Sequence, residues 1–263
     1  MSKLPQVTYL LVIFLGLVQG LTEFLPVSST GHLIIVENLF GISQKDFGLA
    51  FDASLHLGTL LAILAFFAKD YLNILNFKNK LFINLLVGTV PAVLFGIVFE
   101  RLVETTFRQI WIVAASLILF SFVLLLAEKL SKRNRHLAQI KPIDALIVGL
   151  FQSLALIPGI SRSGATISAG LFLGLRRQEA ARFAFMLSGP IIAGAGTKKF
   201  LDVLSQPSNG DQLTFFLIGM ISSAFFGYLT IQYFLKYLQT KTLYPFVFYR
   251  IVVGLLLLAT ILI

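Results

Sequence analysis

The stretch QGLTEFLPVSSTGH, residues 19–32, decides the fold, because it places polar side chains directly after an apolar run. Residues 9–22 contain no charged side chain, and Glu23, two serines, a threonine and His32 then follow in quick succession. Pro26 lacks a backbone N–H and interrupts a helix. Inside a membrane, polar groups of this kind are costly and mark a functional site by default. The stretch therefore predicts a broken helix at a functional site, provided that the chain lies in a membrane.

The composition indicates a polytopic membrane protein. The chain has 263 residues, of which 57% are hydrophobic and 13% charged, and its mean hydropathy is +0.89. A soluble domain of this size cannot bury so much apolar surface. The runs that approach or exceed the roughly 20 residues of a membrane span are 82–99, 110–127, 212–235 and 243–263, with 49–68 and 183–197 as weaker candidates.

The cysteine content, the net charge and the N-terminal segment further limit the kinds of site and partner that this membrane protein can have. The chain has no cysteine, which excludes disulfides and thiolate metal sites. The net charge of +9 is spread over loops, which favours a role in membrane topology over nucleic-acid binding. The apolar N-terminal segment is similar to a signal peptide but continues into the opening stretch without a small-residue cleavage site. We expect it to be retained.

A second stretch, IVGLFQSLALIPGISRSGATI at 147–167, aligns with residues 14–34 without a gap at an offset of 133. The polar and glycine matches in register are Gly16 with Gly149, Gln19 with Gln152, Ser28 with Ser161, and Gly31 with Gly164. We therefore predict one membrane domain, 1–263, built from a first repeat at 1–130 and a second at 142–263. Between them, KLSKRNRHLAQIK at 129–141 is predicted to be a cytoplasmic basic linker.

Loop charges predict that the two repeats have opposite orientations. Short cytoplasmic loops are rich in Lys and Arg. Such markers are Lys69, Lys78, Lys80, the linker 129–141, Arg176, Arg177, Arg182, Lys236 and Lys241. The number of spans between these basic loops predicts that the first motif enters the membrane from the outside and the second from the inside. Two repeats with opposite orientations form an inverted repeat. Lys198 and Lys199 fall on the predicted outer side and do not fit this scheme.

The expected fold class is an all-α polytopic membrane protein. About six transmembrane helices accompany two re-entrant helical hairpins, whose tips meet near the membrane midplane. Non-helical backbone at that depth requires surrounding protein or water, and Pro26 and Pro158-Gly159 interrupt the two motifs. Two full-length kinked spans are the alternative reading of these motifs.

The serine-rich turns at 28–31 and 161–164 are expected to start new helices. Unpaired N–H groups and the helix dipole make such positions anion sites. Arg162 adds a planar fork that matches two phosphate oxygens. The predicted substrate-binding residues are Gln19, Ser28, Thr30, Ser161, Arg162, Ser163 and Gly164. An ion pair between Arg162 and Glu23 is the alternative, and it too would bring the two motifs into contact.

Catalytic candidates gather in the first motif. Gln19 and Glu23 lie one helical turn apart on one face, and they are the predicted oxygen ligands for Mg²⁺ or Ca²⁺. One carboxylate is too few for a protein cage, so substrate phosphates must hold most of the ion. Ser28, Ser29 and Thr30 offer hydroxyl nucleophiles, and His32 is the nearest base unless it is an ordinary buried histidine. No catalytic role is predicted for Asp52, His56, Asp144 or Glu179, whose positions are typical of loops or helix ends. The predicted anion site, cation ligands, hydroxyl nucleophiles and base together suit phosphoryl transfer on a membrane lipid.

QGLTEFLPVSSTGH and PGISRSGAT resemble the two signature motifs of undecaprenyl-diphosphate phosphatase, the bacitracin-resistance membrane phosphatase of bacteria. The resemblance covers essentially the whole chain. It implies a hydrolase that converts undecaprenyl diphosphate to undecaprenyl phosphate and inorganic phosphate. That reaction recycles the carrier lipid for cell-wall synthesis. The resemblance also implies a location in the bacterial inner membrane, with the active site facing outside.

The resemblance also implies residue roles. Ser29 and His32 are nucleophile and base, with the assignment between them open, and Glu23 completes the catalytic set. The implied diphosphate-binding set is Ser161, Arg162, Ser163 and Thr166. Where the family has Glu or Gln, this chain has Gln19, which argues against a two-carboxylate metal site. The expected partners are a polyprenyl diphosphate, membrane lipids and, as an open option, a second copy of the chain.

The main rival function is a lipid-phosphate transporter or flippase, because inverted repeats with broken helices are common in transporters. Transport requires no nucleophile or base, so Ser29, His32 and Glu23 favour an enzyme. A purely structural scaffold leaves the polar residues of both motifs without a purpose.

Overall fold

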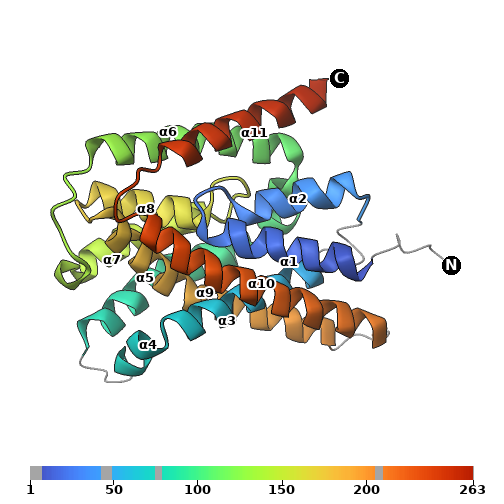
Figure 1. The fold of residues 1–263 in the computed structure, drawn as a ribbon, viewed down its shortest axis with the longest axis horizontal. Coiled ribbons are helices and arrows are strands. Elements are labelled where there is room, and N and C mark those ends of the chain that lie inside the picture. Colours follow the sequence, from blue (N-terminus) through green and yellow to red (C-terminus); the bar gives the residue numbers. More distant parts are fainter. Residues whose placement is uncertain (1–7, 43–48, 75–78, 205–209, 263) are drawn as a thin grey trace.

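The computed structural model describes residues 8–42, 49–74, 79–204 and 210–262, and within these ranges the chain forms eleven α-helices and no β-strand (Figure 1). The prediction of an all-α fold is confirmed. The helices are α1 Tyr9–Phe24, α2 Ser29–Leu39, α3 Leu49–Phe66, α4 Ala68–Ile74, α5 Lys80–Glu104, α6 Ile110–Leu130, α7 Pro142–Leu154, α8 Arg162–Phe172, α9 Arg177–Leu204, α10 Gly210–Tyr237 and α11 Tyr244–Leu262. The 3₁₀ helices are η2 Thr106–Arg108 and η3 Leu137–Gln139.

In the part of the chain that the structure describes, four helices are long and apolar enough to cross a membrane, namely Lys80–Val103, Ile110–Leu130, Leu213–Tyr237 and Tyr244–Ile261. They coincide with the four strong spans predicted from sequence. The two weaker candidates form α3 and α9, of 18 and 28 residues. The chain is therefore a multi-pass membrane protein.

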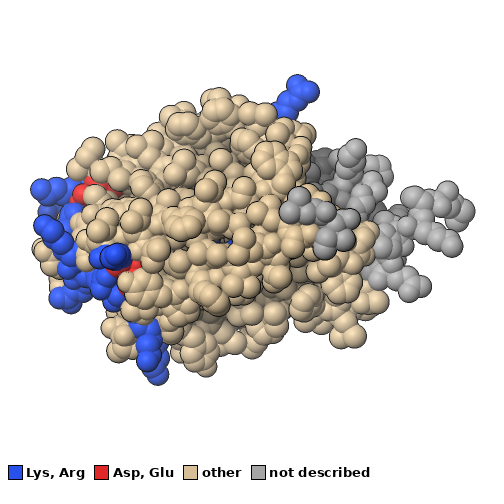
Figure 2. Space-filling view, turned by 90° about the horizontal axis from the view of Figure 1, so that it is seen from above, with Lys and Arg blue, Asp and Glu red and all other residues tan. Residues whose placement is uncertain are grey.

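Lysine and arginine side chains gather at one end of the molecule, and a broad uncharged surface occupies most of its length (Figure 2). The loops that join α6 to α7 and α10 to α11 lie at the same end, on the left of Figure 1. By the positive-inside rule this end is predicted to face the cytoplasm. The orientation in the membrane stays a prediction.

Each sequence motif forms a pair of short helices, α1–α2 and α7–α8. Helices α2 and α8 have 11 residues each, which corresponds to about 16 Å of rise. The hydrocarbon core of a bilayer is about 30 Å thick. The second helix of each pair is therefore too short to span by itself, which favours re-entrant hairpins over full-length kinked spans.

Glycines explain how the two hairpins pack. At Gly16 of α1 an added Cβ would overlap Ser222 of α10, and at Gly149 of α7 it would overlap the backbone of Gly88 in α5. Small residues of this kind let membrane helices approach closely. Each hairpin thus packs against a long helix from the other half of the chain, through glycines that match in the alignment. The repeat boundaries at 1–130 and 142–263 stay a prediction.

The basic linker is attached to the second half. The Arg135 N–H donates to Gly174 O at 2.9 Å, and its guanidinium binds Asp144 Oδ2 at 2.5 Å. Just before the linker, the buried Glu128 binds Arg177 of α9. Asp144 also accepts from the Lys141 N–H at 2.9 Å, which places it at the first turn of α7, as a helix-end residue.

Candidate active site

The two hairpin loops end in the same local structure. Ser28 and Ser161 are the N-cap residues of α2 and α8, and both have φ of 76°. Each side chain accepts a hydrogen bond from the glycine three residues later, Gly31 N at 3.4 Å and Gly164 N at 3.1 Å. This positive φ is uncommon for residues other than glycine and marks functional sites. The capping hydrogen bond supports it here.

The two loops also contact each other, as predicted. Gly159 N donates to Ser28 Oγ at 3.0 Å, and Ser163 Oγ donates to Leu25 O at 2.9 Å. In both hydrogen bonds the second motif supplies the donor and the first motif supplies the acceptor. These bonds place the start of α8 against the end of α1.

Arg250 of α11 donates hydrogen bonds to both hairpin loops. Its side chain is fully buried and donates to Pro26 O at 3.0 Å and to Gly159 O at 2.8 Å. Its Nε donates to Ser121 Oγ at 3.2 Å, and its guanidinium lies 5.8 Å from the centroid of the Phe120 ring. The hydrogen-bond acceptors found among the described residues are neutral oxygens. A buried charge requires such hydrogen bonds, so Arg250 fixes the two loop carbonyls.

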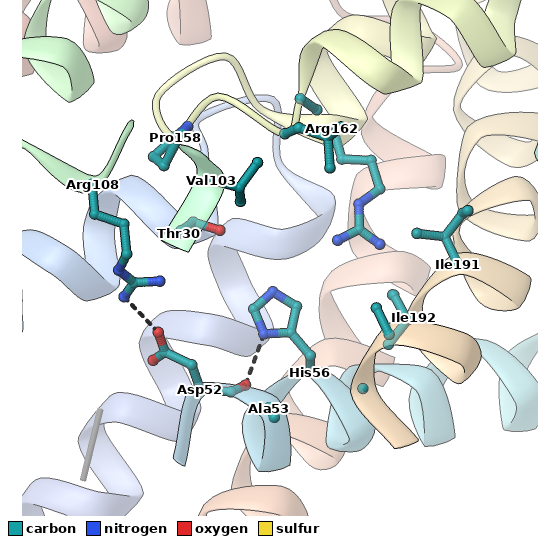
Figure 3. A pocket seen from close by; sticks show the side chains of 14 residues that line it. Thr30, Asp52, Ala53, His56, Val103, Arg108, Pro158, Arg162, Ile191 and Ile192 are labelled. Atoms are coloured by element: carbon teal, nitrogen blue, oxygen red, sulfur yellow. Dashed lines mark hydrogen bonds and ion pairs between the residues drawn. The ribbon is translucent and has the colours of Figure 1, made fainter. Parts of the chain in front are cut away.

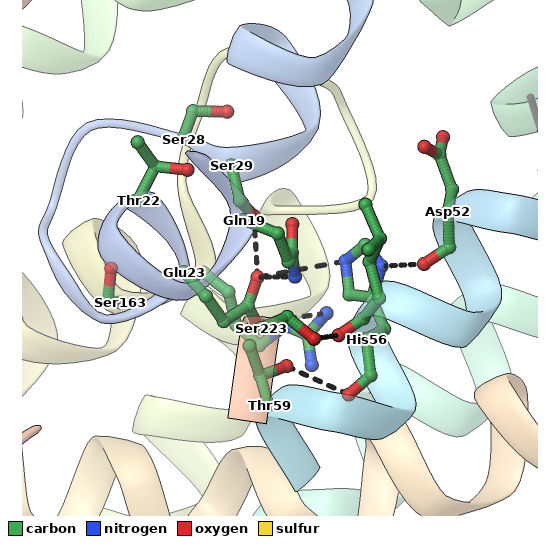
Figure 4. A network of polar contacts seen from close by, with 12 residues as sticks. Gln19, Thr22, Glu23, Ser28, Ser29, Asp52, His56, Thr59, Ser163 and Ser223 are labelled. Atoms are coloured by element: carbon green, nitrogen blue, oxygen red, sulfur yellow. Dashed lines mark hydrogen bonds and ion pairs between the residues drawn. The ribbon is translucent and has the colours of Figure 1, made fainter. Parts of the chain in front are cut away.

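A polar cluster surrounds the Glu23 carboxylate (Figure 4). Oε2 accepts from Ser29 Oγ at 2.5 Å and from Gln19 Nε2 at 3.1 Å. Oε1 lies 3.7 Å from Arg162 Nη2. His56 Nε2 lies 3.6 Å from Oε2. The structure thus brings Gln19, Glu23, Ser29 and Arg162 together, and it adds His56.

A cavity of about 220 Å³ opens beside this cluster. His56 and Arg162 point into it from opposite sides, as Figure 3 shows, and Thr30 and Arg108 also line it. Arg108 donates to Asp52 Oδ2 at 2.8 Å. The second terminal nitrogen of Arg162, Nη1, is buried and has no hydrogen-bond partner among the described residues. A buried donor of this kind is costly to leave unpaired, and an anion in the cavity would pair with it.

Sequence reasoning missed His56. This residue lies in the middle of an apolar helix, α3, far from both motifs in sequence. Its Nδ1 contacts Asp52 O at 2.8 Å. A carbonyl can only accept, so Nδ1 carries a proton and Nε2 faces Glu23. The sequence offered one signal, which is an Asp–His pair at i, i+4 that shares a helical face.

His32 lies apart from the Glu23 cluster. Its Nδ1 donates to Ser28 O at 2.8 Å, and its Nε2 contacts the Tyr249 hydroxyl at 2.7 Å. The two rings stack with their centroids 5.6 Å apart. Among the described residues, neither ring nitrogen has a contact to Ser29 or Glu23. The expectation that His32 is the catalytic base stays a prediction, and this geometry does not favour it.

The other predicted binding residues serve mainly to hold the loops. Ser28, Ser161 and Gly164 take part in the caps described above. Thr166 Oγ1 donates to Arg162 O at 2.7 Å, which satisfies its hydroxyl within α8. Thr30 lines the cavity.

The donor set for a metal ion is small. Among the described ranges, no group of three or more His, Asp or Glu side chains could hold an ion. Gln19 Oε1 is buried and has no hydrogen-bond partner in this part of the chain. It is therefore the protein oxygen that a cation or a further donor would satisfy, next to Glu23.

Comparison with known proteins identifies the family of this chain. Residues 12–256 match the family model described as bacitracin resistance protein BacA. The chain belongs to this family. Relatives named undecaprenyl-diphosphatase include one from Rubrobacter xylanophilus, 41% identical over 95% of this chain and 97% of the relative. Another, from Thermodesulfovibrio yellowstonii, is 44% identical over 90% and 91%. A third, from Mycobacterium marinum, is 40% identical over 99% and 98%. Membership therefore extends over nearly the whole chain.

Proposed function

We propose that this protein is an undecaprenyl-diphosphatase, which hydrolyses undecaprenyl diphosphate to undecaprenyl phosphate and inorganic phosphate. The names of its relatives support this activity. The observation that carries it is the buried, unpaired Nη1 of Arg162. The other terminal nitrogen of Arg162 lies 3.7 Å from the carboxylate that accepts a hydrogen bond from the Ser29 hydroxyl. An anion-binding group, a nucleophile and a proton acceptor are what phosphoryl transfer from a lipid diphosphate requires.

Ser29 is the proposed nucleophile. Its Oγ donates to Glu23 Oε2 at 2.5 Å, so Glu23 accepts the proton as Oγ bonds to the terminal phosphorus. The bond between that phosphorus and the bridging oxygen breaks, and undecaprenyl phosphate leaves. Water then attacks the phosphoserine, the bond between phosphorus and Oγ breaks, and Glu23 returns its proton to Oγ. Inorganic phosphate leaves with the atoms of the water, and Ser29 and Glu23 are restored. This scheme assigns the base to Glu23 instead of His32, because only Glu23 contacts the hydroxyl among the described residues.

Arg162 and the helix starts bind the diphosphate. The guanidinium fork can pair with two phosphate oxygens, and it stabilises charge that develops on them during transfer. The first N–H groups of α2 and α8 have no partner within their helices and favour anions. In this scheme Ser28, Ser161, Ser163, Gly164 and Thr166 keep these donors in place.

Mg²⁺ or Ca²⁺ is the proposed cofactor. Glu23 and Gln19 Oε1 fit such an ion as two oxygen ligands, and phosphate oxygens and water would have to complete its coordination. When bound, the ion would supply positive charge to the diphosphate. In this scheme the proton moves between side chains of the protein, and the ion takes no part in that transfer.

The proposed location is the bacterial inner membrane, with the cavity facing outside. The support is that basic side chains gather at one end of the molecule (Figure 2), where α6 leads into the linker, whereas η2 lies at the other end of α6. Arg108 of η2 lines the cavity, so the cavity and the basic end lie towards opposite sides of the bilayer. Hydrolysis on that side would return the carrier lipid to cell-wall synthesis and would oppose bacitracin.

Phosphate release from undecaprenyl diphosphate by the purified protein in detergent tests the proposal, with Mg²⁺ or Ca²⁺ supplied. Rapid quenching should trap phosphate on Ser29, and Ser29→Ala should abolish both the adduct and turnover. Ser131→Ala, in the linker, is the matched control and should retain both. An adduct on His32 would contradict the assignment of the nucleophile. Absence of release from a cooperatively unfolding wild-type protein would contradict the function itself.

A further inference from the structure

A second cavity, of about 350 Å³, lies between α5 and α9. Its walls include Val93, Gly96 and Ile97 of α5 and Pro190, Ile191 and Gly194 of α9. Its charged lining residues are Glu100 and Lys198, whose side chains form an ion pair at 2.7 Å. We call this cavity the α5–α9 groove. Its lining is otherwise apolar, unlike that of the Arg162 cavity.

The α5–α9 groove adjoins the Arg162 cavity. Val103, Leu156, Ile191 and Ala195 line both spaces. Leu156 belongs to the loop that carries Arg162, so one end of the groove lies against the proposed diphosphate site. A molecule with a charged head and an apolar chain matches the two spaces in this order.

The groove opens on the outer surface of the bundle. The side chains of Val93 and Ile97 line it, and these residues are 43% and 70% exposed. It runs along α5 from Ala92 to Val103, a rise of about 16 Å. Exposed apolar side chains on a membrane-spanning helix face lipid tails, and the Glu100–Lys198 pair is of the kind found near the water interface. The groove therefore connects the hydrocarbon to the cavity from the side.

We propose that the α5–α9 groove binds the isoprenoid chain of the lipid diphosphate next to its head group. This proposal rests on the proposed function. A chain that moves from lipid to an apolar groove gains little hydrophobic energy, because both surroundings are apolar. The groove instead orients the chain, and it thereby aligns the terminal phosphorus with Ser29.

Two glycines allow the groove to be filled without damage to the helices. An added Cβ at Gly194 meets no heavy atom within 4 Å, and at Gly96 it meets only Leu156, at 4.0 Å. Both lie within helices, where replacement of glycine favours the helical state. Gly194→Phe and Gly96→Phe should therefore fold and occupy the groove. Leu256→Phe, on an exposed face of α11, is the matched control.

The experiment compares kcat/KM for undecaprenyl diphosphate with that for dimethylallyl diphosphate, whose chain is too short to fill the groove. Gly194→Phe and Gly96→Phe should lower the value for the long substrate by about tenfold or more. The short substrate and the Leu256→Phe variant should be unaffected. Loss on both substrates, or on neither, would overturn the groove proposal.

Photolabelling gives a readout that does not depend on turnover. A farnesyl diphosphate analogue with benzophenone at its chain end should label α5 and α9 in the wild-type protein, and Gly194→Phe should abolish that labelling. Labelling only of other helices would contradict the proposal. A wild-type protein that is labelled on α5 and α9 but hydrolyses neither substrate would contradict the proposed function and leave the groove assignment intact.

Discussion

Gly159 donates its backbone N–H to the hydroxyl oxygen of Ser28 at 3.0 Å, across 131 positions of sequence. The same oxygen accepts from Gly31 N at the start of α2. One serine hydroxyl thus caps its own helix and joins it to the opposite loop. The geometry of the proposed active site therefore depends on a side chain that takes part in neither step of the proposed reaction.

Ser28→Ala should destabilise the protein. It removes the acceptor for two N–H groups and keeps the unfavourable φ of 76°, so we expect a loss of about 1–3 kcal/mol. Ser28→Gly removes the same acceptor but tolerates the positive φ, and it should lose less. Thermal unfolding in detergent gives the order of the two variants. Equal stability of Ser28→Ala and wild type would contradict the role of the cap.

Glu23→Gln should lower kcat by about a hundredfold or more, because an amide cannot accept the Ser29 proton. Combining it with Ser29→Ala should cost little beyond Ser29→Ala alone, since the two residues act as one unit. Turnover of both single variants and the double variant measures this coupling. Additive losses would show that Glu23 acts independently of the hydroxyl.

Arg162→Lys should raise KM for the lipid diphosphate by about tenfold, because lysine keeps the charge but loses the fork that binds two oxygens. Arg162→Ala should raise KM and also lower kcat, since it removes the charge during transfer. Arg176→Lys, on an exposed side chain at the basic end, is the control and should leave both constants unchanged. A silent Arg162→Ala would refute the site.

Arg250→Ala should disorder both loops together. It leaves the carbonyls of Pro26 and Gly159 without their donor, at a cost of about 1–3 kcal/mol for each group. Added guanidinium should restore part of the turnover in this variant, whereas ammonium should not, because only the planar ion reproduces both hydrogen bonds. Rescue by both ions, or by neither, would argue against a specific role of the Arg250 guanidinium in holding the two loop carbonyls.

His32→Asn and His56→Asn form a matched pair. An Asn amide can replace the Nδ1 donor of either histidine, to Ser28 O or to Asp52 O, but it has no atom at the Nε2 position. His32→Asn should therefore retain most of kcat, while His56→Asn should lose about tenfold or more, because it loses the group that faces Glu23. The opposite order in steady-state kinetics would restore His32 as the base.

The sequence predicted much of the fold because the signals are local or repeated. Uncharged runs marked the four long spans, and the matched Gly16 and Gly149 marked two hairpins that pack alike. Contact between the loops followed from the serine-rich turns and from Arg162, which needs an anion or a partner.

Partners that depend on the packing of distant helices could not be predicted. His56 reaches Glu23 because α3 packs closely on α10, where an added Cβ at Gly58 would overlap Ser223. His32 is engaged by Tyr249, which lies 217 positions away. Neither contact leaves a pattern within one segment. An analysis of the sequence alone therefore assigns to the site His32, which is the histidine nearer to Ser29 along the chain.

The hydrogen bonds from Arg250 to the two loops also determine when the site can form during synthesis of the chain. Arg250 belongs to α11, which is translated long after Pro26 and Gly159. Until α11 is made, both loops lack the donor that holds their carbonyls in the folded protein. A chain that terminates early would contain every proposed reacting group and still lack the part that aligns them, so premature release should yield inactive protein in place of an unregulated hydrolase.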